Sequence, residues 1–217
     1  MKNRKIGIFG GSFDPIHNGH LAIAKSAYQD FDLDEVWFVP AGHSPNKKES
    51  NMTPAGQRAK MTELAIASIP YFQLSKIEIE AAETSFTYLT LEKLKKNNPL
   101  DTFYFIMGAD SLDYFEKWRH PDRICACANI LVAVRDDWDC TKVKEKITEI
   151  KKLFQAEISL LSVKKMDVSS HKIRSDIANG IPVGDRIPDA VEKYIKEKGL
   201  YQNDGNNRNE EKAEKRA

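Results

Sequence analysis

The sequence lacks any apolar run long enough to cross a membrane, and it lacks a strong excess of charge of either sign. Its apolar runs are strand-sized, as in Ile130–Val134, whereas a membrane-spanning helix needs roughly 20 residues. The 33 Lys and Arg residues nearly balance the 32 Asp and Glu residues, which leaves a formal net charge of +1. These properties give no reason to expect a membrane or a nucleic acid as partner. The apolar part of the N-terminus is too short for a signal peptide, so we expect a cytoplasmic protein.

Cysteine is also scarce. The three cysteines, Cys125, Cys127 and Cys140, form neither an even disulfide framework nor the spacing of a metal site. Cys125 and Cys127 come just before a predicted strand, where cysteines at alternate positions behave as small buried hydrophobic residues. We therefore expect no redox or metal function for them.

Apolar runs and helical periodicity alternate along the chain. Six strands are predicted at residues 5–9, 36–39, 72–74, 102–107, 130–134 and 158–163. Helical spacing predicts helices at about 21–31, 54–69, 88–96, 142–154, 171–179 and 189–198. Strongly apolar strands separated by helices predict an α/β fold, a single Rossmann-like, doubly wound parallel sheet with helices on both faces.

The last residues differ in composition from the rest. Residues 202–217 contain no aliphatic side chain larger than alanine and mix acidic with basic residues. Such a segment buries too little apolar surface to offset the entropy lost on ordering. We expect one domain over residues 1–201, followed by a disordered charged tail.

Four polar stretches directly follow predicted strands. They are residues 10–20, 40–48, 108–111 and 167–174. In a parallel sheet the carboxyl ends of the strands meet at one edge, and ligands bind there at the point where the strand order reverses. The four stretches are therefore expected to converge on one site.

The stretch at 10–20, GGSFDPIHNGH, places two glycines after a strand and two histidines at the start of a helix. Glycines let the backbone approach a ligand closely and present amide N–H groups to an anion. His17 and His20, three residues apart, project to the same side. The stretch lacks the G-x-G-x-x-G fingerprint and the Lys-Ser/Thr of a P-loop. A zinc site is the alternative, but the two histidines, even with Asp14, do not complete a tetrahedron.

The stretch at 167–174, DVSSHKIR, begins another helix. Ser169 and Ser170 supply an N-cap and hydroxyl donors, and the helix dipole favours a negative ligand. Arg174 lies one turn further on the same face and can bind phosphate oxygens with two N–H groups. An ordinary capped helix with an exposed arginine would have the same sequence. This stretch alone therefore does not distinguish a phosphate-binding site from an ordinary helix start.

No Ser-His-Asp, Cys-His or paired-carboxylate arrangement stands out in the sequence. The predicted site instead offers N–H groups, hydroxyls and cations. Transfer of a phosphorus group to an already ionised phosphate needs no general base, because positioning and charge neutralisation supply the catalysis.

Together the two motifs resemble the nucleotidyltransferase superfamily marked by H-x-G-H and I-S-S-x-x-x-R. Within it the chain is similar to the bacterial nicotinate-nucleotide adenylyltransferases, from about residue 5 to residue 201. The more selective matches are Ser85–Thr87, residues 105–111, Lys117 with Trp118, Arg135, and residues 187–201. The resemblance implies transfer of AMP from ATP to nicotinate mononucleotide, giving deamido-NAD and pyrophosphate. It implies small-molecule substrates, with Mg²⁺ arriving with ATP rather than held in a protein site.

The resemblance also implies roles for single residues. It implies catalytic roles for His17, His20, Lys47 and Arg174. It implies ATP binding by Gly10, Gly11, Ser12, Phe13, His17, His20, Gly108, Ser169, Ser170 and Arg174. It implies mononucleotide binding by Ser85, Thr87, Asp110, Trp118 and Arg135. In this assignment the histidines supply positive charge at the α-phosphate, and Trp118 stacks on the nicotinate ring.

The chain departs from the family pattern in one loop. Where the family has P-P-H-K, this sequence has Ser44–Lys47, and a histidine stands earlier, at His43. Whether Lys47 or His43 acts is therefore left open. The alternatives are a pantetheine-phosphate adenylyltransferase or cytidylyltransferase of the same superfamily, and a nucleotide-binding sensor without catalysis. A tRNA synthetase would need an anticodon-binding domain for which the chain lacks room.

Overall fold

The computed structural model describes residues 3–42, 52–81, 84–135, 140–164 and 166–202. Within them, one parallel sheet contains all six predicted strands in the order β3-β2-β1-β4-β5-β6. The strands are β1 (Lys5–Gly11), β2 (Glu35–Pro40), β3 (Phe72–Leu74), β4 (Thr102–Gly108), β5 (Ala128–Arg135) and β6 (Ile158–Val163). The strand order reverses between β1 and β4, which is where an open parallel sheet binds its ligand.

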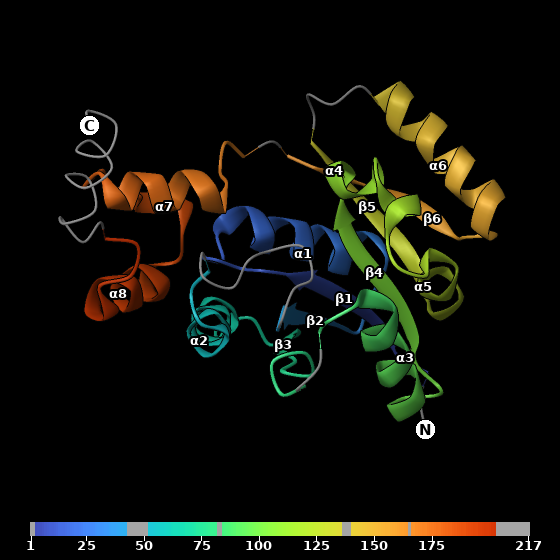
Figure 1. Cartoon of the computed structure of the whole chain (residues 1–217), viewed down its shortest axis with the longest axis horizontal. Coiled ribbons are helices and arrows are strands. Elements are labelled where there is room, and N and C mark those ends of the chain that lie inside the picture. Colours follow the sequence, from blue (N-terminus) through green and yellow to red (C-terminus); the bar gives the residue numbers. More distant parts are fainter. Residues whose placement is uncertain (1–2, 43–51, 82–83, 136–139, 165, 203–217) are drawn as a thin grey trace, which may run out of the picture.

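Helices cover both faces of the sheet, which confirms the predicted doubly wound fold (Figure 1). One face carries α1 (Asn18–Asp30), α2 (Ala55–Ile66), α7 (Ser170–Ala178) and α8 (Asp189–Lys198). The other face carries α3 (Thr87–Asn97), α4 (Ala109–Leu112), α5 (Pro121–Cys127) and α6 (Cys140–Phe154). Two short 3₁₀ helices, η2 (Phe115–Lys117) and η3 (Gly184–Arg186), complete the described elements.

The two cores follow from the alternation of side chains along each strand. In β1, Ile8 packs into the core beneath α3 and α6, and its neighbour Phe9 packs into the core beneath α1 and α2. In β4, Phe105 and Ile106 divide between the two cores in the same way. The run of consecutive apolar residues within each of these strands thus reflects a sheet buried on both sides.

The segment between β4 and β5 differs from the expectation. It contains α4, η2 and α5, none of which was predicted, because helices of three to seven residues show too little periodicity to be recognised. Cys125 and Cys127 lie at the end of α5, directly before β5 as predicted. Both are half-buried, and burial raises the pKa of the Cys125 thiol to about 11.

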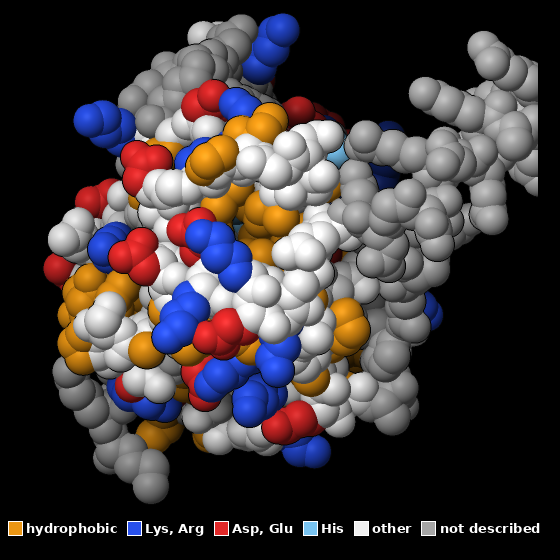
Figure 2. Space-filling view, turned by 90° about the vertical axis from the view of Figure 1, so that its left-hand side faces the viewer, with side chains coloured by type: hydrophobic (Ala, Val, Ile, Leu, Met, Phe, Trp, Pro, Cys, Tyr) orange, Lys and Arg blue, Asp and Glu red, His pale blue; other side chains and the backbone are white. Residues whose placement is uncertain are grey.

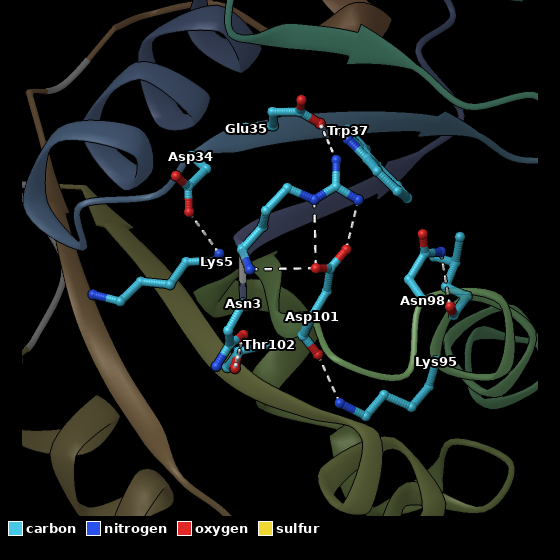
Figure 3. Close-up of polar contacts among 11 residues, drawn as sticks. Asn3, Lys5, Asp34, Glu35, Trp37, Lys95, Asn98, Asp101 and Thr102 are labelled. Atoms are coloured by element: carbon cyan, nitrogen blue, oxygen red, sulfur yellow. Dashed lines mark hydrogen bonds and ion pairs between the residues drawn. The ribbon is translucent and has the colours of Figure 1, made fainter. Parts of the chain in front are cut away.

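The amino-terminal edge of the sheet is closed by a polar cluster around Asp101 (Figure 3). Asp101 is 5% exposed, and its Oδ2 lies 2.6 Å from Nη2 of Arg4. Lys95 Nζ donates to the Asp101 main-chain oxygen at 2.6 Å. Arg4 precedes β1 and Asp101 precedes β4. These contacts fasten the two central strands together at the edge opposite the predicted ligand-binding edge.

The outer surface carries mixed charge. On the face shown in Figure 2, Lys and Arg side chains are interspersed with Asp and Glu side chains, as the balanced composition predicts. None of the described helices combines the length and the apolar character needed to cross a membrane. The predicted disordered tail falls, from residue 203 onward, outside the described residues.

Candidate active site

The two glycines of the first motif are the last residues of β1. Gly10 pairs with Val39 and Gly11 with Pro40 of β2, so both belong to the sheet and not to a turn. The left-handed backbone in this motif occurs at Phe13, with φ of 48°. A Cβ on Gly11 would lie 3.0 Å from the Phe13 ring. The glycine is therefore explained by close packing and not by an unusual dihedral angle.

His17 and His20 form a reciprocal cap at the start of α1. The His20 main-chain N–H donates to His17 Nδ1 at 3.3 Å, and the His17 main-chain N–H donates to His20 Nδ1 at 3.2 Å. The two rings stack with their centroids 3.6 Å apart. This geometry fixes both imidazoles at the amino end of the helix, where the dipole favours an anion.

The caps also define the protonation of the rings. A ring nitrogen that accepts an N–H bond carries a lone pair, so the proton of each neutral imidazole is on Nε2. A proton on Nδ1 would oppose a main-chain N–H and remove the cap. With Nδ1 of each ring accepting a main-chain N–H, Nε2–H is the ring group that can donate to a ligand.

Phe13 holds the second ring in place from the core. It is 2% exposed, and its ring meets His20 edge-on with the centroids 5.1 Å apart. The side chain of Phe13 is thus part of the hydrophobic core. A contribution of Phe13 to ATP binding would have to come from its backbone.

Gly19 brings the two motifs into contact. A Cβ at this position would lie 2.8 Å from Cγ1 of Val168 and 3.1 Å from Nδ1 of His17. Val168 directly precedes Ser169 and Ser170 at the start of α7. A side chain at position 19 would therefore push apart the amino ends of α1 and α7.

Hydrogen bonds join the same two motifs. Ser170 Oγ donates to the Pro15 main-chain oxygen at 2.9 Å, and Arg174 Nη1 donates to the Asp14 main-chain oxygen at 2.6 Å. Ser169 Oγ caps α7 by accepting the Lys172 N–H at 3.2 Å. The predicted convergence of the motifs at residues 10–20 and 167–174 is thus observed.

A first cavity of about 230 Å³ lies on the β4–β6 side of the site. Its polar lining includes His17 and Asp110, and its apolar lining includes Ile23, Val134 and Val168. Gly108 also lines it, at the end of β4. Asp110, which the sequence assigned to the mononucleotide, therefore lies beside a predicted ATP-binding residue.

A second cavity of about 680 Å³ lies on the β1–β2 side. Segments that are distant in sequence contribute to its wall, which includes Gly10, Gly11, Ser12, Ala41, Glu78, Ser85, Phe86, Thr87, Phe105, Tyr114, Lys117, Trp118 and Arg119. Three of the predicted mononucleotide residues, Ser85, Thr87 and Trp118, are brought together here. Lys117 and Arg119 flank Trp118 and add two cations that the sequence analysis did not assign.

Glu78 is the acidic group of this second cavity. Its Oε1 accepts a hydrogen bond from Thr90 Oγ1 at 2.8 Å. Burial raises the pKa of Glu78, and the bond from Thr90 opposes that shift. The sequence signal for Glu78 was weak, because it follows the three-residue strand β3 in an alternating acidic and apolar stretch.

Two predicted residues are not placed with the others. Arg135 ends β5, one residue beyond Val134 of the first cavity, so its backbone lies on that side and not beside Trp118. Lys47 and the alternative His43 fall outside the described residues. No group of three or more His, Cys, Asp or Glu residues that could hold a metal ion occurs in the described parts of the chain.

Comparison with known proteins places the chain in a family. The family model described as cytidylyltransferase-like matches residues 8–176. A relative from Lachnoclostridium phytofermentans, named "Probable nicotinate-nucleotide adenylyltransferase", is 39% identical over 198 residues, which cover 91% of this chain and 99% of the relative. A relative of the same name from Clostridium botulinum (strain Okra) is 39% identical over 198 residues, covering 89% and 97%. The chain belongs to the nicotinate-nucleotide adenylyltransferases.

Solved structures share the fold. The Plasmodium falciparum nicotinic acid mononucleotide adenylyltransferase complexed with NaAD matches with a TM-score of 0.74 at 22% identity, covering 92% of this chain and 98% of that chain. The complex of the same enzyme with APC matches with a TM-score of 0.72. The solved structures confirm the predicted fold, and the two relatives confirm the predicted family. In this nicotinate-nucleotide adenylyltransferase the H-x-G-H motif lies where β1 ends and α1 begins, at the carboxyl-terminal edge of the sheet.

Proposed function

We propose that this chain transfers AMP from MgATP to nicotinate mononucleotide, forming deamido-NAD and pyrophosphate. The observation that supports this most strongly is the position of the joined motifs between two cavities. His17 lines the first cavity, and residues 10–12 of the same motif line the second. A reaction between two nucleotides needs two such sites that meet at the reacting phosphates.

The first cavity suits the adenosine part of ATP. Val134, Val163 and Val168 supply apolar walls for a flat base, and Gly108 at the end of β4 permits close approach of the backbone. The Asp110 carboxylate can accept hydrogen bonds from ribose hydroxyls. We therefore assign Asp110 to the ATP side, in place of the mononucleotide side.

The second cavity suits nicotinate mononucleotide. The Trp118 ring offers a face for stacking on the electron-poor pyridine ring. Lys117 and Arg119 provide positive charge near the carboxylate and phosphate of this substrate. The Ser12 backbone at the floor of the cavity adjoins the phosphate-binding loop.

The reaction takes place where the triphosphate crosses the amino ends of α1 and α7. An oxygen of the mononucleotide phosphate attacks the α-phosphorus of ATP and forms a new P–O bond. The bond from the α-phosphorus to the bridging oxygen breaks, and that oxygen leaves with pyrophosphate. Nε2–H groups of His17 and His20 donate to the α-phosphate oxygens, and Arg174 with Ser170 holds the departing phosphates. Mg²⁺ enters as part of the MgATP substrate.

The acceptor is tested by measuring pyrophosphate release with three candidates in parallel. Nicotinate mononucleotide, nicotinamide mononucleotide and phosphopantetheine are each supplied with MgATP. We expect the highest kcat/KM with nicotinate mononucleotide, because Lys117 and Arg119 favour its carboxylate over the neutral amide. Turnover with phosphopantetheine alone would overturn the proposal.

A further inference from the structure

Arg58 of α2 is a buried cation that contacts the backbone at two points of the wall of the second cavity. It is 2% exposed. Its Nη1 donates to the Ser12 oxygen at 2.7 Å and its Nη2 donates to the Ala41 oxygen at 2.6 Å. Its Nε donates to the Thr53 oxygen at 2.9 Å. Ser12 and Ala41 follow two neighbouring strands, so one guanidinium fixes the spacing between two walls of the cavity.

Asp14 is a buried carboxylate in the phosphate-binding loop, with 4% exposure. Its Oδ1 accepts the Tyr201 hydroxyl at 2.6 Å, and its Oδ2 accepts the Thr53 N–H at 3.3 Å. The main-chain oxygen of the same residue accepts Nη1 of Arg174 at 2.6 Å. The position of the Arg174 guanidinium therefore depends on how the Asp14 side chain is held.

Tyr201 connects this loop to the carboxyl-terminal end of the fold. It follows α8 and packs against the core that contains Phe13 and Ile16. Burial, followed by the Asp14 charge, raises the pKa of the Tyr201 hydroxyl, so it remains protonated and donates. Burial also lowers the pKa of Arg58, and the Asp14 charge opposes that shift. The negative charge of Asp14 thus offsets part of the cost of burying the positive charge of Arg58.

We propose, building on the function above, that Arg58, Asp14 and Tyr201 form a positioning network for the reaction. The network sets the geometry of loop 12–15 and, through the Asp14 main-chain oxygen, aims Arg174 at the departing phosphates. None of its members touches substrate in this account. Through this network the catalytic rate depends on the hydroxyl of Tyr201. That hydroxyl holds the Asp14 carboxylate, which lies 187 residues earlier in the sequence.

The test begins with Tyr201→Phe, which removes one hydroxyl and keeps the packed ring. Tyr194→Phe is the matched control, because Tyr194 lies on α8 and packs against the same core. We expect kcat of Tyr201→Phe to fall by about ten-fold with less than about two-fold change in KM for the mononucleotide, since misplacement of a catalytic group acts on the transition state. Tyr194→Phe is expected to keep the wild-type kcat.

A double-mutant cycle separates positioning from stability. In an Arg174→Ala background the Tyr201→Phe change is expected to cost less than about two-fold, because the residue through which it acts is gone. An equal loss in both backgrounds, or a wild-type kcat in Tyr201→Phe, would overturn the proposal. Arg58→Lys, which keeps the charge and loses the three-way contact, provides a second variant with the same expected pattern. Failure of the wild-type protein to turn over nicotinate mononucleotide would instead contradict the proposed function. In that case the same four proteins are compared by their affinity for a non-hydrolysable ATP analogue.

Discussion

The Arg174 guanidinium donates a hydrogen bond of 2.6 Å to the main-chain oxygen of Asp14, across 160 residues of sequence. This contact joins the amino end of α7 to the loop that follows β1. Ser170 makes a parallel contact to Pro15 at 2.9 Å. Two motifs that the sequence predicted to converge at one edge of the sheet are thus joined directly by hydrogen bonds.

Replacement of His20 by Ala is expected to lower kcat by about 100-fold or more, in the range seen when one donor to a developing charge is removed. Binding of nicotinate mononucleotide should change little, because the second cavity does not include His20. Steady-state kinetics and quenching of tryptophan fluorescence on mononucleotide binding measure the two effects. A wild-type kcat in this variant would exclude the proposed role of His20.

Replacement of Gly19 by Ala is expected to destabilise the fold by about 1–3 kcal/mol, as for other insertions into packed sites. The added Cβ would meet Val168 Cγ1 at 2.8 Å. Val168→Ala removes that methyl group, so the double variant should recover part of the lost stability. Gly56→Ala is the control: its Cβ would have no neighbour within 4 Å, and it should not lower the melting temperature. Thermal unfolding measures these changes in stability, and parallel activity assays show whether activity follows them. A melting temperature that Val168→Ala does not raise in the Gly19→Ala background would contradict the packing explanation.

Asp110→Asn and Trp118→Ala are expected to raise the KM of different substrates. Asp110 lines the cavity of His17, whereas Trp118 lines the larger cavity with Thr87. We predict about a ten-fold rise in KM for ATP in the first variant, corresponding to loss of a hydrogen bond to a charged group. A similar rise in KM for the mononucleotide is predicted in the second, through loss of ring stacking. A rise in the KM for the mononucleotide, and not for ATP, in Asp110→Asn would contradict the assignment of Asp110 to ATP.

Cys125 is expected to react slowly with alkylating reagents. Burial raises its pKa from 9.0 to about 11. The thiolate is the reactive form, so at pH 8 its fraction is lowered about 100-fold relative to an unperturbed thiol. Iodoacetamide labelling of a variant with Cys127→Ser and Cys140→Ser measures this rate against a model peptide. Labelling at the peptide rate would contradict the buried position in α5.

The sequence predicted the layers of this fold better than the contacts of its site. The central strands were identifiable because both faces of the sheet are buried there, which produces continuous apolar runs such as Ile130–Val134. The edge at which the motifs meet followed from parallel strands alone. The division of the edge into two cavities did not follow, because it depends on where the short elements α4 and η2 place Asp110 and Trp118.

The positioning network was less accessible to sequence analysis. Arg58 lies on the same helical face as the buried residues Thr62 and Ala65, at i+4 and i+7. A cationic residue on the buried face of a helix indicates that it pairs with polar groups in the interior, because unpaired charges are almost never fully buried. Its partners, however, are main-chain oxygens of distant segments, and main-chain oxygens leave no trace in the side-chain sequence.

The transfer of the α-phosphorus is tested most directly by following labelled ATP. With ATP labelled at the α-phosphorus and nicotinate mononucleotide as acceptor, we predict that the label appears in deamido-NAD at the rate of pyrophosphate release. The rate should fall by the same factor in His20→Ala for both products. Label recovered in ADP or in free AMP, with no dinucleotide formed, would contradict adenylyl transfer at the site between α1 and α7.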